Sequence, residues 1–275
     1  MRADSTGKIS LDHIYTQPDP RAYFSTLREL DYAIPQLAKP YFTKLLQEYK
    51  DATGVRHPTV LDLGCSYGIN AALLRCDATM DELYERYSGP GSAEPGTEEM
   101  VRRDRELVRS RTGSRTTRFV GLDTSEPALS YAVRAGFLDD AVHADLEEND
   151  PTGPQRERLA AADLVISTGC IGYVTEKTIG RIVAAAREGG RRPWMAHFVL
   201  RMFPFDAVEE TLAAAGYETV RADGVFRQRR FATADEESQV LDTLAGVGVD
   251  AGGVESEGGL YARLHISRPR AASDA

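Results

Sequence analysis

Two acidic residues that each close an apolar run, Asp62 and Asp123, are the first candidates for chemistry in this sequence. The first run continues into a turn that carries Gly64, Ser66 and Gly68, and then into a helical pattern. A strand that turns on glycines into a helix directs backbone N–H groups and the positive helix end toward one crevice. A carboxylate offers two acceptor oxygens and no donor, which suits paired hydroxyl groups. We therefore predict that a nucleotide-like cofactor binds at this turn.

Alternating strands and helices must position these residues. Apolar runs of strand length alternate with segments whose apolar residues recur at helical spacing, a pattern typical of an α/β fold with a mostly parallel sheet. The predicted strands lie near 59–63, 119–123, 141–146, 163–168, 194–200, 218–231 and 260–268. The predicted helices lie near 21–31, 36–49, 69–75, 79–87, 97–110, 126–136, 175–187, 205–215 and 235–245.

The stretch from Val60 to Gly68 resembles motif I of the class I S-adenosylmethionine (SAM) dependent methyltransferases. That motif reads hydrophobic-hydrophobic-Asp-hydrophobic-Gly-x-Gly-x-Gly, and Ser66 stands here at the middle glycine. Because only a positive φ demands glycine, we expect Ser66 to have a negative φ. The resemblance covers about 55–268 and implies a Rossmann-like sheet of seven mostly parallel strands with the last one reversed. It also implies SAM as cofactor and S-adenosylhomocysteine (SAH) as product.

The resemblance assigns roles to individual residues. Asp123 is expected to accept hydrogen bonds from the ribose hydroxyls, Asp145 to meet the adenine amino group, and the backbone of Leu146 to lie beside the ring. Further cofactor contacts are expected from the turn, the strand ends and the N-terminal segment, at Asp62, Gly64, Cys65, Ser66, Gly68, Asn70, Thr124, Ser167, Thr168, Gly169 and Tyr23.

Two segments lie outside the alternating order. Residues 1–50 are predicted to form a helical cap, and residues 51–275 the SAM-binding domain. In small-molecule members of the resembled family such a segment covers the cofactor, so Tyr15 and Tyr23 are expected at the site. Residues 76–116 are predicted to be an insertion, by default a solvated excursion and alternatively a lid or partner surface.

The catalytic candidates follow from what methyl transfer requires. The reaction is an in-line displacement, so the protein mainly positions the nucleophile. A hydroxyl acceptor needs a general base, an amine needs only to be uncharged, and a carboxylate needs neither. The loop 169–173 contains no Asp, Glu or His. We predict Tyr173, His197 and Tyr15 as catalytic, with helix packing as the alternative for Tyr173 and core burial as the preferred alternative for His197.

Three functions stay open at this point. The first is a methyltransferase acting on a small molecule, for example in natural-product biosynthesis. The second is a SAM cyclase of the same fold that forms a small-ring amino acid, azetidine-2-carboxylate or 1-aminocyclopropane-1-carboxylate, and releases methylthioadenosine. An aromatic side chain near the sulfonium, such as Tyr173 or Tyr15, would stabilise that cation. The third is a non-catalytic SAM-binding protein.

Composition limits the partners. The formal net charge of −9 disfavours a nucleic-acid partner. No secretory signal or membrane-spanning run is evident, and the three scattered cysteines are typical of a reducing cytoplasm. We expect a cytoplasmic protein with a small-molecule substrate, no zinc or other metal site, and no nucleic-acid or membrane partner. A homodimer stays open.

Overall fold

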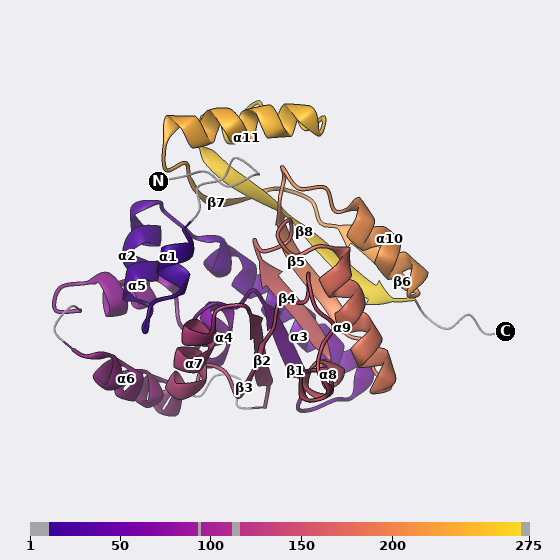
Figure 1. The fold of residues 1–275 in the computed structure, drawn as a ribbon, viewed down its shortest axis with the longest axis horizontal. Helices are drawn as coiled ribbons and strands as arrows, with labels where there is room; N and C mark the ends of the chain where they lie inside the picture. The colour runs from indigo at the N-terminus through magenta and orange to yellow at the C-terminus, as the bar shows by residue number, and fades with distance from the viewer. Residues whose placement is uncertain (1–10, 93–94, 112–115, 271–275) are drawn as a thin grey trace.

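The computed structural model describes residues 11–92, 95–111 and 116–270. Its central sheet has the order β3-β2-β1-β4-β5-β8-β6 (Figure 1). Five strands run parallel to one another, namely β1 (Thr59–Leu63), β2 (Arg118–Asp123), β3 (Asp140–His143), β4 (Leu164–Thr168) and β5 (Trp194–Leu200). The last strand of the chain, β8 (Gly259–Pro269), is antiparallel to β5 and to β6 (Tyr217–Arg221). The predicted fold class is confirmed, including the reversed last strand.

The sheet has one strand more than predicted. The single strand expected at 218–231 is interrupted by a turn in which Gly224 has a φ of +88°. Its second half forms β7 (Phe226–Arg230), which also pairs with β8. The turn places β6 and β7 along successive stretches of the same long strand.

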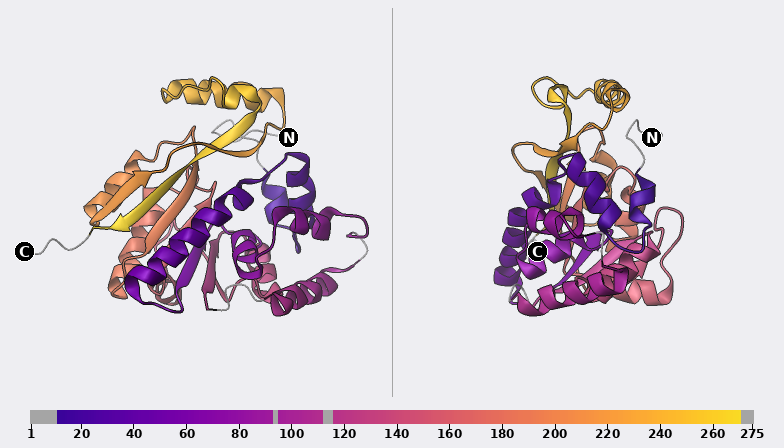
Figure 2. Two further views of the ribbon diagram at one scale, coloured as in Figure 1. Left: turned by 180° about the vertical axis from the view of Figure 1, so that it is seen from behind. Right: turned by 90° about the vertical axis from the view of Figure 1, so that its left-hand side faces the viewer.

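Helices cover both faces of the sheet because its central strands are buried on both sides, as all five residues of β1 are. On one face, α3 (Ile34–Thr53) packs with the inner sides of α4 (Ile69–Cys76) and α7 (Glu126–Ala135). The opposite face is covered by α8 (Gly153–Ala160), α9 (Glu176–Glu188) and α10 (Asp206–Ala214). Figure 2 shows the long α3 crossing the first face.

A third layer lies outside α4 and α7. It consists of α1 (Asp12–Tyr15) and α2 (Arg21–Glu29) from the cap, and α5 (Met80–Ser88) and α6 (Thr97–Ser110) from the predicted insertion. The rings of Phe24 and Tyr87 stack with centroids 4.6 Å apart, and Met100 and Val101 are buried in the same cluster. The expectation of a solvated excursion at 76–116 is therefore wrong, since the apolar sides of α5 and α6 form one core with the cap.

Short polar signals fix several helix starts. The Thr79 hydroxyl accepts the Glu82 N–H, and the Glu82 carboxylate accepts the Thr79 N–H, which forms a capping box. Ser125 caps α7 by accepting the Ala128 N–H with its side chain. The helix α8 was not predicted from the sequence, although Gln155 accepts the Thr152 N–H at its start in a similar way.

A small separate hydrophobic cluster lies at the N-terminal end of β8. There α11 (Ala234–Gly246) and the short helix η1 (Glu255–Glu257) pack on the strand's first residues (Figure 1). The guanidinium of Arg229 binds both carboxylate oxygens of Glu236 at 2.6 and 2.9 Å, and both side chains are buried. Within the described ranges, no helix combines the length and apolarity needed to cross a bilayer.

Candidate functional site

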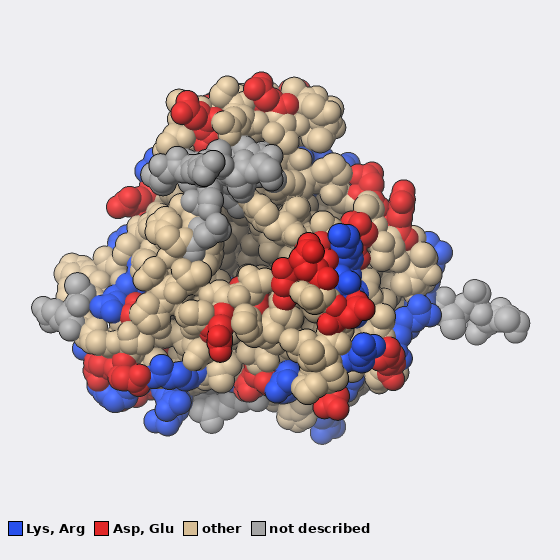
Figure 3. Space-filling view, viewed as in Figure 1, with Lys and Arg blue, Asp and Glu red and all other residues tan. Residues whose placement is uncertain are grey.

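A large cavity opens where β1, β2 and β4 end. Its volume is about 780 Å³, and small-molecule sites span roughly 300–1,000 Å³. β1 lies between β2 and β4, where the strand order reverses, which is the usual ligand crevice of open α/β sheets. The cap and the 169–174 loop form the remaining walls. Figure 3 shows the hollow at the centre of this face, with acidic side chains gathered beside it.

The turn after β1 adopts left-handed backbone conformations at three alternate positions. Gly64, Ser66 and Gly68 have φ values of +66°, +48° and +75°. The predicted negative φ of Ser66 is wrong. Its left-handed conformation is stabilised by the Asp123 carboxylate, which accepts the Ser66 N–H at 2.8 Å. A serine therefore occupies a position that favours glycine, at a cost of about 1–2 kcal/mol.

Gly64 is required by close packing as well as by its φ. A Cβ added there would lie 2.7 Å from the Cβ of Cys170, in the loop after β4. The Cys170 thiol in turn contacts the Leu63 carbonyl at 3.3 Å. The turn after β1 and the loop after β4 therefore touch directly at the base of the cavity.

The acids at the strand ends are held by main-chain donors. The two oxygens of Asp123 accept the N–H groups of Ser66 and Ser125 at 2.8 and 2.9 Å. Burial raises the pKa of Asp123, and these two bonds oppose that effect. Asp145, after β3, accepts the Glu147 N–H at 3.0 Å and lines the same cavity. The carboxylates thus stand at fixed positions along the strand-end wall.

A buried polar chain supports the turn from behind. The Asn70 amide donates to Asp62 at 2.9 Å and to the Thr168 hydroxyl at 3.2 Å. Burial raises the pKa of Asp62 to about 7. Within the described residues, Asp62 Oδ2, Asn70 Oδ1 and Ser66 Oγ are buried without a hydrogen-bond partner. Because unpartnered buried polar atoms are costly, those that face the cavity are suited to a polar ligand.

The cap contributes a wall of tyrosines. The rings of Tyr15 and Tyr23 meet edge to face at 5.7 Å, and those of Tyr23 and Tyr32 at 6.3 Å. All three line the cavity. The Tyr32 side chain also lies close to Tyr23 and Thr168, which brings the aromatic wall next to the buried polar chain.

Main-chain contacts fasten the cap to the cofactor turn. The hydroxyl of Tyr67, within the turn, lies 3.0 Å from the Ile14 carbonyl and 2.9 Å from that of Gln17. The Ser125 hydroxyl donates to the Tyr15 carbonyl at 2.5 Å. The position of Tyr15 at the cavity is therefore set by residues of the turn and of the α7 N-terminus.

The loop after β4 forms the opposite wall. Tyr173 lines the cavity, is 43% exposed, and meets the Phe203 ring at 5.8 Å. Glu147 accepts the backbone N–H and the hydroxyl of Thr175 and the hydroxyl of Thr178, at 2.5–2.8 Å. Although burial opposes it, these bonds hold the pKa of Glu147 below its usual value. Glu147 thus anchors the loop to the start of α9.

Most residues proposed from the sequence meet at this cavity. Those that line it are Tyr15, Tyr23, Gly64, Cys65, Ser66, Asn70, Asp123, Thr124, Asp145, Leu146, Thr168, Gly169 and Tyr173. Asp62, Gly68 and Ser167 lie behind the cavity lining, and their predicted cofactor contacts stay predictions. Asp62 holds Asn70, and Gly68 begins α4 with no room for a side chain beside Ala132.

His197 lies in the core and not at the cavity. Its side chain is fully buried, and its Nδ1 is 2.8 Å from the Ser167 hydroxyl. Burial lowers its pKa to about 3, with the neighbouring His265 adding to the effect. The catalytic assignment is corrected accordingly, in favour of the core alternative.

Sequence reasoning missed several residues of the cavity. Tyr32, Glu147, Cys170 and Thr178 line the cavity but received no role from the sequence. Glu147 follows the predicted adenine acid by two positions, which was an available signal. Thr178 and Cys170 belong to no recognisable sequence motif. The start of α9 places Thr178 at the cavity, and the loop after β4 places Cys170 there.

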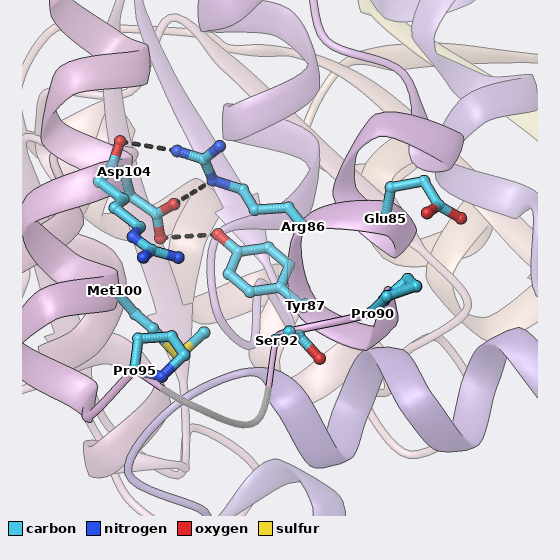
Figure 4. A pocket seen from close by; sticks show the side chains of 10 residues that line it. Glu85, Arg86, Tyr87, Pro90, Ser92, Pro95, Met100 and Asp104 are labelled. Atoms are coloured by element: carbon cyan, nitrogen blue, oxygen red, sulfur yellow. Dashed lines mark hydrogen bonds and ion pairs between the residues drawn. The ribbon is translucent and has the colours of Figure 1, made fainter.

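A second described cavity, of about 210 Å³, lies in the third layer between α5 and α6. Figure 4 shows Arg86 and Tyr87 turned toward Asp104, whose oxygens they bind at 2.6 and 2.7 Å. Tyr131 of α7 also donates to Asp104, at 2.5 Å. The polar groups there satisfy one another, so this cavity is a structural joint between α5, α6 and α7.

Over the described part of the chain, no group of three or more His, Cys, Asp or Glu side chains is placed to hold a metal ion. No protein-family model matches the chain, and no curated protein matches its sequence.

Solved structures similar to the chain include SAM-dependent methyltransferases. The plantazolicin methyltransferase in complex with a triazolic desmethylPZN analogue and SAH is 10% identical, with 86% of this chain and 85% of that one covered and a TM-score of 0.41. Magnesium protoporphyrin IX methyltransferase from Synechocystis, with bound SAM, is 10% identical over 84% and 79%, with a TM-score of 0.39. A TehB-like SAM-dependent methyltransferase from Corynebacterium glutamicum is 14% identical over 84% and 98%, with a TM-score of 0.38. Likeness this distant carries no argument about function. The argument about function therefore rests on the cavity.

Proposed function

We propose that this chain binds SAM in the strand-end cavity and transfers its methyl group to a small molecule. The observation that carries the proposal is the left-handed turn after β1 locked to Asp123 at the end of β2, where the strand order reverses. This arrangement presents backbone N–H groups and a carboxylate to one crevice, as a nucleoside ligand requires.

The residues present fit such a ligand. SAM carries an ammonium group and ribose hydroxyls as donors, and Asn70 Oδ1 and Ser66 Oγ are buried acceptors of the cavity without a partner in the described residues. Asp123 and Asp145 add carboxylate acceptors on the same wall. The cavity volume of about 780 Å³ also admits a further small molecule.

When bound, SAM would supply an activated methyl group on a sulfonium. The chain's own residues then have three tasks. Asp123 would hold the ribose, Asn70 the amino acid end, and the tyrosine wall of Tyr15, Tyr23 and Tyr32 would exclude water while its ring faces tolerate positive charge. Positioning of this kind is what the displacement requires from the protein.

A second candidate is the SAM cyclase. It is favoured by one observation, which is that the cap and loop walls of the cavity, at Tyr15, Tyr23, Tyr32, Cys170 and Tyr173, hold no charged side chain in the described residues. A reaction within SAM itself would need no separate acceptor subsite. Aromatic faces there would stabilise the sulfonium in both reactions.

One experiment separates these functions. The protein is incubated with SAM alone and with SAM plus a panel of small acceptors, and the products are identified by mass spectrometry. SAH formed only with an acceptor supports the methyltransferase, and methylthioadenosine formed from SAM alone supports the cyclase. Bound but unchanged SAM in every incubation would leave a binding protein, and no SAM binding would contradict the proposal.

A further inference from the structure

We propose that the nucleophile of this site is an uncharged amine nitrogen. The inference rests on the proposed function, because it concerns the group that attacks the SAM carbon next to sulfur. It is reached by asking which nucleophiles the described walls of the cavity can activate and which they can tolerate.

A hydroxyl or thiol nucleophile is poorly served, because it requires a general base. The loop side offers Cys170 and Tyr173, and burial raises the pKa of the Cys170 thiol to about 12. The cap side offers tyrosines, and burial raises the pKa of Tyr23 and Tyr32 above the ordinary value. Neutral groups of such high pKa do not remove protons at neutral pH.

The carboxylates of the cavity are already engaged. Glu147 accepts hydrogen bonds from Thr175 and Thr178, which favour its charged form and weaken it as a base. The N–H groups of Glu147 and Glu148 both bind Oδ1 of Asp145, and in the proposed complex its other oxygen is taken up by the adenine amino group. Burial makes Asp123 more basic, but in the proposed complex its oxygens are taken up by ribose hydroxyls and the Ser66 and Ser125 N–H groups. In that complex no described acid of the cavity is therefore free to activate a hydroxyl.

A carboxylate or phosphate nucleophile needs no base, but it needs a counter-charge. None of the cavity-lining residues that the structure describes is Lys, Arg or His, whereas Asp123, Asp145 and Glu147 line it. An anion inside the cavity would face like charges in a partly desolvated space, which raises its free energy. The lack of a free base and the lack of a counter-charge together favour a nucleophile that is neutral before attack and cationic after it.

An amine nitrogen meets both conditions. Its lone pair forms the new C–N bond, the C–S bond breaks with its electron pair left on sulfur, and the positive charge passes from sulfur to nitrogen. A tertiary amine keeps that charge, and a primary or secondary amine then loses a proton to water. The faces of Tyr15, Tyr23 and Tyr32, together with the acidic wall, stabilise the cation that results.

Two sources can supply this nitrogen. It belongs to a separate acceptor in the methyltransferase reaction, or it is the α-amine of SAM itself in the formation of azetidine-2-carboxylate. The carbon nucleophile needed for 1-aminocyclopropane-1-carboxylate requires removal of a proton from carbon, so the same lack of a base disfavours it.

The test begins with binding. SAM and SAH are titrated into the full chain by calorimetry, which examines the proposed function alone. The SAH-saturated protein is then titrated with matched triplets that share a skeleton and carry an amine, a hydroxyl or a carboxylate, starting with phenethylamine, 2-phenylethanol and 3-phenylpropionate. For a separate acceptor we expect the tightest-binding skeleton to bind at least about tenfold more tightly as its amine than as its carboxylate.

Product analysis distinguishes the two sources. The same triplets are incubated with SAM, beside a SAM-only sample, and SAH and methylthioadenosine are quantified from pH 6 to 9. We expect SAH only with amines, or methylthioadenosine with azetidine-2-carboxylate from SAM alone. In both cases the rate should rise about tenfold per pH unit below the pKa of the reacting amine, because only its free base attacks.

The outcomes are separable. Preferred binding of carboxylates, SAH formation from a hydroxyl or carboxylate probe, or a rate independent of pH would overturn the inference and leave SAM binding intact. SAM binding with neither amine binding nor turnover in any sample would also overturn it. Failure to bind SAM would instead contradict the proposed function.

Discussion

The strand-end side and the cap side of the cavity are built in different ways. On the strand-end side, short connections fix Ser66, Asp123 and Asp145 through main-chain hydrogen bonds. On the cap side, Tyr15, Tyr23 and Tyr32 come from separate helices and turns, and their rings pack edge to face. The strand-end side offers hydrogen-bond donors and acceptors at fixed positions. The cap side offers a defined shape and an uncharged aromatic surface. This difference suggests that the strand-end side recognises the cofactor and the cap side selects the chemistry.

The largest expected effect is a loss of SAM affinity when the strand-end side is altered. Asp123→Ala removes the proposed acceptor of two ribose hydroxyls, and a hydrogen bond to a charged group contributes about 1.5–3 kcal/mol. SAM affinity should therefore fall by roughly two orders of magnitude or more, measured by calorimetry. Asp150→Ala is the matched control, because Asp150 is an exposed acid that pairs with Arg181. Equal affinities of the two variants would refute the role of Asp123.

The contact between the turn after β1 and the loop after β4 can be tested through stability. Gly64→Ala introduces a left-handed alanine whose Cβ overlaps Cys170, at a cost of about 1–2 kcal/mol for the backbone and about 1–3 kcal/mol for the overlap. Gly54 also has a positive φ, but an added Cβ there would meet no neighbouring atom. Gly54→Ala therefore measures the backbone cost without the overlap. Urea unfolding should show the larger loss for Gly64→Ala. Equal losses would mean that the Gly64–Cys170 contact carries no strain.

The same comparison explains what the sequence could reveal. The strand-end side was predictable because an acid after a buried strand and a glycine turn form a local pattern, as at Asp62 to Gly68. The cap side was only partly predictable. Tyr15 and Tyr23 were expected there, but Tyr32 reaches the cavity through tertiary packing against Tyr23 and Thr168, which leaves no local signal.

Two errors have the same physical origin. The positive φ of Ser66 depends on Asp123, which lies 57 positions away in the chain. The packing of α5 and α6 depends on the cap, which supplies the apolar partner for their buried sides. Local periodicity indicates that a helix has an apolar side but does not show what covers it.

A smaller effect is expected from the buried histidines in the core behind the cavity. Burial lowers the pKa of His197 to about 3 and that of His265 to about 4. Both groups stay neutral in the folded state while the unfolded chain takes up protons below about pH 6.5, so stability is lost as pH falls from about 6.5 toward 4. Asp62 has the opposite effect in this range, because its raised pKa makes the folded state bind the additional proton.

Asp62 is unchanged in His197→Gln, so wild type and this variant can be compared directly. Between pH 6.5 and 4, urea unfolding should show a loss of stability in the wild type that exceeds the variant's by up to about 1.4 kcal/mol per pH unit. SAM affinity at pH 7.5 should be the same in both proteins, because His197 does not line the cavity. A large loss of SAM affinity in His197→Gln would return this residue to the site.

The smallest expected effect concerns the attachment of the cap. Tyr67→Phe removes the hydroxyl that meets the Ile14 and Gln17 carbonyls, a loss of about 1 kcal/mol. Amides 12–17 should exchange hydrogen faster, and SAM affinity should fall about fivefold. Tyr49→Phe is the control, since it loses a hydroxyl bond to Asp163 away from the cavity. Unchanged exchange in Tyr67→Phe would show that this hydroxyl does not hold the cap.

The central claim is that the strand-end side of the cavity binds SAM, and calorimetric titration of SAM into the full chain tests it most directly. The account predicts saturable binding with a single molecule per chain, and competition by SAH for the same site. Absence of binding at millimolar SAM, or binding that SAH does not displace, would contradict the account.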